Sequence, residues 1–181
     1  DVNGDGLSDL LVSARGADPG GDSYAGENYV VFGKSNTTTV DLGNLSTGGF
    51  RIDGIDANDS SGGSASGAGD INGDGLADII IGARGAVVGG SNGVGESYII
   101  FGKADGATVD LENLGTGGIL VEGIDTIDRS GNSVSGAGDV NGDGLADLFI
   151  GARDADPGGV DTAGESYVVF SPSTAPTDAT Y

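Results

Sequence analysis

The sequence predicts an all-β protein in which a unit of four short antiparallel strands is repeated along the chain. One observation is a twelve-residue stretch, DINGDGLADIII at Asp70–Ile81, whose three copies begin 69 residues apart at Asp1, Asp70 and Asp139. Another is that no segment shows a sustained 3.6-residue period of apolar residues, so little helix is expected. A repeat of this length with one supersecondary pattern per unit is typical of a β-propeller or a repeat array.

Each unit contains four strand candidates. Ser64–Gly69 is a run of small residues that enters the repeated stretch, and Asp78–Ala83 leaves it with three consecutive isoleucines. Ser97–Phe101 is aromatic and β-branched, and Ile119–Ile124 has its counterpart at Phe50–Ile55. Clusters of Gly, Asp, Asn and Ser separate these candidates. Four short antiparallel strands per repeat make a propeller blade.

The repeat period divides the chain into segments. Counted from the repeated stretches, the first repeat covers residues 1–69 and lacks its first strand, the second covers 70–138, and a partial third covers 139–171. Residues 172–181 are rich in Pro, Thr and Ala and are expected to form a tail or linker. About two and a half repeats cannot close a propeller, which needs at least ~4 blades. We therefore expect an incomplete propeller within a fragment of a longer protein.

Composition excludes several classes of function. The formal charge is -21, from 28 acidic and 7 basic residues, which argues against nucleic acid and anionic membranes as partners. No apolar stretch approaches the ~20 residues of a membrane span, so no membrane insertion is expected. The chain has no His and no Cys, which removes the commonest general base and all thiolate chemistry. We therefore expect a protein that is not an enzyme.

The repeated stretch has the residue pattern of a loop that binds a hard cation. Oxygen-bearing side chains stand at its first, third, fifth and ninth positions, and the sixth is Gly, which bends at low cost. Such an all-oxygen donor set suits Ca²⁺. An EF-hand is excluded because it needs a Glu at position twelve, where this chain has Val12, Ile81 and Ile150. The alternative is that these residues build polar turns without a metal.

Longer motifs resemble a known family. The segment GAGDVNGDGLADLFIGA, followed by GESYVVF, resembles the FG-GAP repeat of integrin α-subunit β-propellers and of large bacterial extracellular surface proteins. The Phe-Gly dipeptide appears as Phe32-Gly33 and Phe101-Gly102, whereas the third copy has Phe170-Ser171. The second half of the motif appears as Gly82-Ala83-Arg84 and Gly151-Ala152-Arg153, with Arg where integrins have Pro. The resemblance covers residues 1–171.

This resemblance implies a calcium-binding hairpin between the first two strands of each blade, and hence two to three structural Ca²⁺ sites. The side-chain ligands would be Asp1, Asn3, Asp5 and Asp9; Asp70, Asn72, Asp74 and Asp78; Asp139, Asn141, Asp143 and Asp147. The seventh residue of each loop would contribute its backbone carbonyl: Leu7, Leu76 and Leu145.

An arginine also recurs twelve residues before a glutamate in each copy. If the second and third strands form a hairpin, this spacing places guanidinium and carboxylate side by side. We therefore expect a structural ion pair in every repeat, the alternative being a clamp for a ligand: Arg15 with Glu27, Arg84 with Glu96, and Arg153 with Glu165.

Together these features predict a calcium-stabilised extracellular β-propeller segment for adhesion or cell-surface interaction. Extracellular calcium, near millimolar, suits weak all-oxygen sites. The expected partners are other blades of the same or neighbouring chains, together with an extracellular protein or polysaccharide. One alternative is a structural subunit of an extracellular filament, sheath or surface layer, because part-propellers expose strand edges. The other is an accessory domain of a secreted enzyme.

Overall fold

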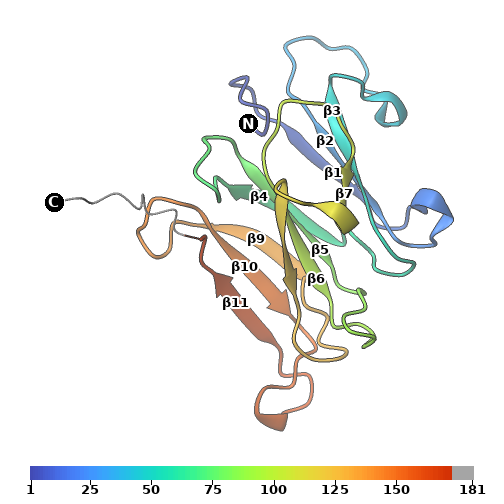
Figure 1. The fold of residues 1–181 in the computed structure, drawn as a ribbon, viewed down its shortest axis with the longest axis vertical. Helices are drawn as coiled ribbons and strands as arrows, with labels where there is room; N and C mark the ends of the chain where they lie inside the picture. Colours follow the sequence, from blue (N-terminus) through green and yellow to red (C-terminus); the bar gives the residue numbers. More distant parts are fainter. Residues whose placement is uncertain (173–181) are drawn as a thin grey trace.

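The computed structural model describes residues 1–172, which form three β-sheets (Figure 1). The first sheet has the order β1-β2-β3-β7, with β1 at Leu10–Ala14, β2 at Glu27–Val31, β3 at Gly49–Asp53 and β7 at Val109–Asp110. The second has the order β4-β5-β6-β8, with β4 at Ser64–Gly69, β5 at Asp78–Ala83, β6 at Glu96–Ile100 and β8 at Gly118–Glu122. The third contains β9 at Ser133–Gly138, β10 at Asp147–Ala152 and β11 at Glu165–Val169, in the order β11-β10-β9.

Helix is almost absent from residues 1–172, as the sequence predicts. The four helical segments there are three-residue 3₁₀ turns: η1 at Pro19–Gly21, η2 at Leu42–Asn44, η3 at Leu111–Asn113 and η4 at Pro157–Gly159. Within these residues no helix has the length and apolar character that crossing a membrane requires. The tail expected at residues 172–181 lies outside the described residues except for its first residue.

The second sheet confirms the predicted antiparallel unit of four strands. Its strands pair in chain order, β4 with β5, β5 with β6, and β6 with β8. β4 and β5 have the bounds that the sequence predicts, whereas β6 and β8 each begin one residue earlier. The sheet as a whole spans residues 64–122, so it is offset from the period counted from the aspartate loops.

The short strand β7 was not predicted. It comes from the second repeat, yet it pairs in parallel with β3 of the first sheet, with Ile52 opposite Val109 and Asp53 opposite Asp110. Only two residues take part, and the pairing joins segments far apart in the chain, so no local pattern reveals it. β7 therefore links two neighbouring sheets.

Two apolar clusters hold the three sheets together. Ile79 and Ile81 of β5 belong to a cluster with residues of the first sheet, including Phe50. Ile80, between them in sequence, belongs to a second cluster with residues of the third sheet, including Ile150. Successive residues of a strand point to opposite faces of its sheet. The unbroken isoleucine run therefore reflects a central sheet that is buried on both faces.

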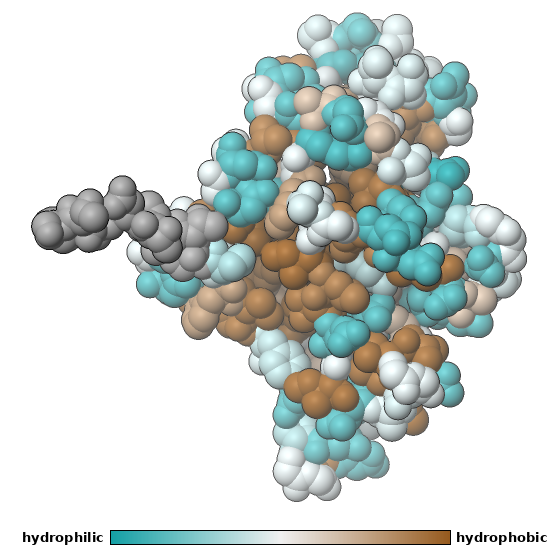
Figure 2. Space-filling view, in the orientation of Figure 1, coloured by the Kyte–Doolittle hydropathy of each residue, from teal (hydrophilic) through white to brown (hydrophobic). Residues whose placement is uncertain are grey.

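The two outer sheets are covered on one side only. Leu10 of β1 is 64% exposed, and Phe170, just after β11, is 56% exposed. Hydrophobic residues gather near the middle of the visible face, over the second and third sheets (Figure 2). An apolar cleft lies there, lined by residues of β8, β10 and β11 that include Val121, Ile150 and Val168. Stacked sheets with this strand order agree with a partial propeller of FG-GAP-like repeats.

Candidate metal site

The three predicted metal loops occupy equivalent places in the three sheets. Residues 70–77 join β4 to β5, residues 139–146 join β9 to β10, and residues 1–9 lead into β1. The fourth and sixth residues of every loop are glycines with positive φ, between 77° and 93°. Because such a conformation is cheap only for Gly, the loop needs two glycines where sequence reasoning singled out one.

The polar side chains of each loop bind the backbone of the same loop. In the second loop Asp70 accepts hydrogen bonds from the N–H groups of Gly73 and Gly75, at 2.7 and 2.9 Å. The third and fifth residues of all three loops each accept a bond, at 2.8–3.0 Å, from the N–H two positions further on. These Asx-type turns curl the loop and hold the first, third and fifth side chains within it.

The ninth residue has a different environment, because it lies at the start of the second strand. Asp78 is fully buried, and its two carboxylate oxygens accept hydrogen bonds from the N–H groups of Ile71 and Gly102, both at 2.8 Å. Asp9 accepts from Val2 and Gly33 in the same way, and Asp147 accepts from Val140 and Ser171. This aspartate therefore ties the start of its loop to the end of the third strand.

The glycine of the Phe-Gly dipeptide is explained by the same contact. A Cβ on Gly102 would lie 2.6 Å from the Cβ of Leu76, and a Cβ on Gly33 would lie 2.6 Å from the carbonyl oxygen of Ser8. In the third copy Ser171 occupies this place, and its hydroxyl donates a hydrogen bond to the carbonyl of Ala146. The serine side chain thus makes a polar contact with the loop at the place where the other two repeats have a glycine without a side chain.

Burial and hydrogen bonding affect the ninth aspartates differently. Burial is the main influence on Asp78 and raises the pKa of its carboxyl, despite the two backbone hydrogen bonds that oppose the shift. Burial also acts to raise the pKa of Asp147, but hydrogen bonds from Ser171, Val140 and Asn141 outweigh it, and the pKa is lowered. The difference agrees with the position of Asp78 in the central sheet and of Asp147 in an outer one.

The donor chemistry of the loops fits a hard cation, because every predicted ligand presents oxygen. Each loop collects its first, third and fifth side chains on one short, mostly exposed turn. The ninth carboxylate is instead directed at backbone N–H groups. Within residues 1–172 no three or more His, Cys, Asp or Glu side chains are arranged as a metal-binding group. The predicted ligand sets therefore stay predictions.

The predicted ion pairs between arginine and glutamate are wrong. Five ion pairs form among residues 1–172, including Glu27 with Arg51 at 3.8 Å and Asp154 with Arg153 at 2.9 Å, and none of the five is a predicted pair. The register explains this result, because an alanine and not the arginine lies opposite each glutamate. The arginine is the next residue along, so its side chain points to the other face of the sheet.

Each of these glutamates instead accepts a hydrogen bond from a tyrosine two residues later on its own strand. The pairs are Tyr29 with Glu27, Tyr98 with Glu96, and Tyr167 with Glu165. Burial and the neighbouring carboxylate raise the pKa of Tyr29 to about 12. The spacing of two residues, which puts both side chains on one face of the strand, was a signal available in the sequence.

Comparison with known proteins confirms the predicted repeat. The FG-GAP repeat matches at residues 62–100 and 130–169, which include the second and third loops. The chain is also similar to phosphatidylinositol-glycan-specific phospholipase D of Dictyostelium discoideum, with 29% identity over 167 residues, or 88% of this chain and 18% of that protein. The protein of the same name from Mus musculus is 37% identical over 102 residues, 56% of this chain and 12% of that protein. The chain spans less than a fifth of the length of these curated relatives.

Proposed function

We propose that this chain, which carries two FG-GAP repeats, is a calcium-stabilised segment of an extracellular β-propeller that serves interaction and not catalysis. The observation that supports it is the threefold occurrence of one loop with the same oxygen donors and the same two Asx-type turns. Bound Ca²⁺ would supply positive charge to a chain of formal charge -21. Millimolar extracellular calcium suits weak all-oxygen sites of this type.

Calcium titration by isothermal calorimetry tests this proposal. The wild-type chain should bind two to three ions, and Asp74→Ala should lose one of them. Asp161→Ala is the matched control, because Asp161 is an exposed aspartate outside the loops and should leave the stoichiometry unchanged. The same number of bound ions in Asp74→Ala as in the wild type, or no binding at millimolar calcium, would contradict the proposal.

The similarity to a phospholipase D supports a second candidate function, an accessory domain of a secreted enzyme. The similar segment covers 18% and 12% of these relatives, so the activity in their name can lie outside it. The chain lacks His and Cys, and its aspartates concentrate in loops. The isolated chain should show no hydrolysis of a phosphatidylinositol glycan. Hydrolysis by this chain that is lost when a carboxylate outside the aspartate loops is replaced would overturn the non-catalytic assignment.

Further blades are the proposed structural partners, from the same or a neighbouring chain. β11 forms the edge of the third sheet, and Val168 on it is 45% exposed, whereas Ile99 at the equivalent place in the second sheet is buried. Ile99 is buried because the third sheet packs on that face of the second, so a further blade would cover Val168 in the same way. Sedimentation velocity over a range of concentrations should show self-association that Val168→Lys reduces. A monomer at all concentrations would contradict assembly between copies of this chain.

A further inference from the structure

Two open cavities of matching composition lie beside the aspartate loops of the first and second repeats. Their volumes are about 340 and about 450 Å³, toward the lower end of the range for small-molecule sites. Each is lined by thirteen residues, and every residue of one lies 69 positions from a residue of the other. Twelve of the thirteen are the same amino acid, and the remaining pair is Val31 and Ile100.

The neighbouring loop shows no such agreement between the repeats. Residues 35–38 are SNTT and the equivalent residues 104–107 are ADGA, so all four positions differ, and none of them lines either of these two cavities. The polar rim of the first cavity is also accessible, since Lys34, Thr39 and Asn44 are all exposed. The two repeats have therefore kept the cavity walls while the adjoining loop has changed.

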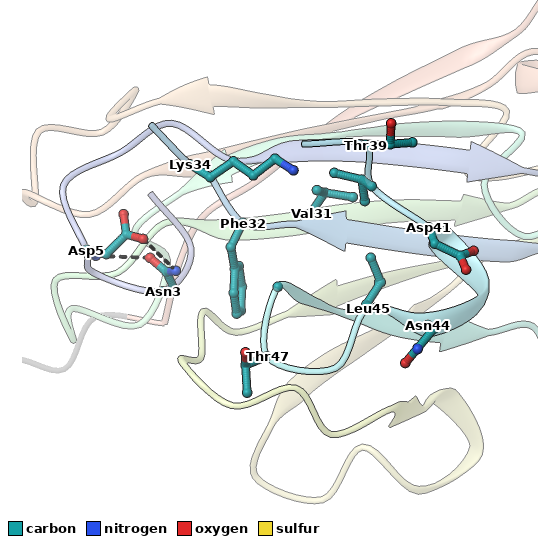
Figure 3. A pocket seen from close by; sticks show the side chains of 13 residues that line it. Asn3, Asp5, Val31, Phe32, Lys34, Thr39, Asp41, Asn44, Leu45 and Thr47 are labelled. Atoms are coloured by element: carbon teal, nitrogen blue, oxygen red, sulfur yellow. Dashed lines mark hydrogen bonds between the residues drawn. The ribbon is translucent and has the colours of Figure 1, made fainter. Parts of the chain in front are cut away.

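The walls combine an apolar centre with a polar rim. Figure 3 shows Phe32 between Asn3 and Asp5 of the aspartate loop on one side and Leu45 and Asn44 on the other. Phe32 is only 7% exposed and packs edge-on against Phe50, with ring centroids 6.0 Å apart, so its position is fixed by the core. Amide, hydroxyl and carboxylate groups surround this floor.

The rim argues against two classes of ligand. An anion would meet two carboxylates in each cavity, on a chain of formal charge -21. The single lysine offers little compensation, because Lys34 Nζ already donates to the carbonyl and hydroxyl of Thr38, and Lys103 Nζ lies 2.9 Å from Asp105. A purely apolar ligand would leave the rim's polar groups desolvated without partners, which is costly.

We propose that these two cavities bind neutral saccharides. Adjacent hydroxyls of a sugar can donate to carboxylates and both donate to and accept from the side-chain amides of asparagine. In the first cavity Asp41 accepts one hydrogen bond, from the N–H of Gly43 at 3.0 Å, and its second oxygen has no donor among the described residues. In the second cavity both oxygens of Asp110 accept hydrogen bonds, from the N–H of Glu112 at 3.0 Å and from the side-chain amide of Asn113 at 2.9 Å, so a sugar would bind there through the remaining lone pairs and the amide oxygen of Asn113. Phe32 and Leu45 supply an apolar floor for the C–H face of the ring. This proposal names a ligand class for the proposed interaction function and rests on it. It shares only Asn3 and Asp5 with the proposed calcium site of the first loop.

Titration of the ¹⁵N-labelled chain with N-acetylglucosamine, galactose and maltose tests the proposal. Amide signals of residues 39–48 and of residues 108–117 should both shift, with two sites per chain. Glucose 6-phosphate and putrescine serve as anionic and cationic comparison ligands and should cause smaller shifts at these residues. Absence of shifts with all three neutral sugars, or shifts with putrescine alone, would overturn the proposal.

Single variants separate the two sites. Asn44→Ala should weaken binding in the first cavity about tenfold, as expected for the loss of a hydrogen-bonding partner, while the second keeps its affinity. Asn113→Ala should show the reverse, and Thr37→Ala, outside the cavity, should change neither. Thr47→Val replaces Asn44→Ala if that variant does not fold. Variants that leave both affinities unchanged would refute the assignment.

Repeating the titration with calcium and with a chelator distinguishes this proposal from the calcium proposal. Sugar-induced shifts that persist while calcium binding is absent would refute the calcium sites alone. Calcium binding without any sugar-induced shift would refute the cavities alone.

Discussion

Replacing Asp78 with alanine tests whether the ninth position of the loop fastens the hairpin to the neighbouring strand. The carboxylate is buried and accepts hydrogen bonds from the backbone N–H groups of Ile71 and Gly102. Alanine would leave both donors without a partner. An unsatisfied buried donor costs about 1–3 kcal/mol, so two would cost about 2–6 kcal/mol. Because burial raises the pKa of Asp78, removing the carboxylate also returns some desolvation energy, and we expect about 2–4 kcal/mol.

Urea denaturation in the presence of a chelator measures this cost without any contribution from calcium. Asp78→Asn keeps one acceptor oxygen and should lie between the wild type and Asp78→Ala. Asp161→Ala, the exposed control, should stay within about 0.5 kcal/mol of the wild type. A loss below about 1 kcal/mol for Asp78→Ala, with an unchanged m-value, would refute the fastening role.

Three further substitutions have clear expected outcomes. Asp59 is 4% exposed, and burial raises its pKa to about 6. Its contribution to stability is therefore present below pH 4 and is lost as the pH rises through about 6. In thermal melts Asp59→Asn should be more stable than the wild type at pH 8, by on the order of 1–3 kcal/mol, but not at pH 4. A Cβ on Gly82 would lie 2.0 Å from the carbonyl oxygen of Gly131, in the loop that leads into β9, whereas a Cβ on Gly67 would meet nothing within 4 Å. Gly82→Ala should therefore cost several-fold more stability in urea denaturation than Gly67→Ala, and equal costs would contradict the packing. Ile127 has φ of 72°, where the first repeat has Asn58 with φ of 74°, so Ile127→Asn should raise stability by about 1 kcal/mol, and a loss would contradict the strain.

Local sequence patterns were sufficient for most of the fold. The 69-residue period placed β4 and β5 at the bounds that the structure gives, because turn residues and apolar runs mark those ends sharply. β7 could not be found this way, since two residues with a parallel partner in another sheet have no local signature. Which apolar cluster each of Ile79, Ile80 and Ile81 joins likewise depends on which sheets flank β5.

Prediction of the candidate site reached the residues but not their roles. Sequence spacing grouped Asp78 with the other aspartates of its loop, yet the strand that follows buries it against backbone N–H groups. The partner of Glu96 depends on the strand register, because a spacing of twelve residues does not show that Ala83 and not Arg84 lies opposite it. The cavities beside Phe32 and Phe101 were missed because their walls come from segments separated along the chain.

Thermal melting of the chain with calcium and with a chelator tests the central claim most directly. Saturation of one site at 100 times its dissociation constant adds about 2.7 kcal/mol, so two or three sites should raise the melting temperature by more than about 5 °C. Sodium chloride at matched ionic strength controls for screening of the acidic surface, and magnesium controls for charge alone. The calcium proposal predicts a rise with calcium that neither control reproduces. The same melting temperature in calcium, in chelator and in both controls would contradict it.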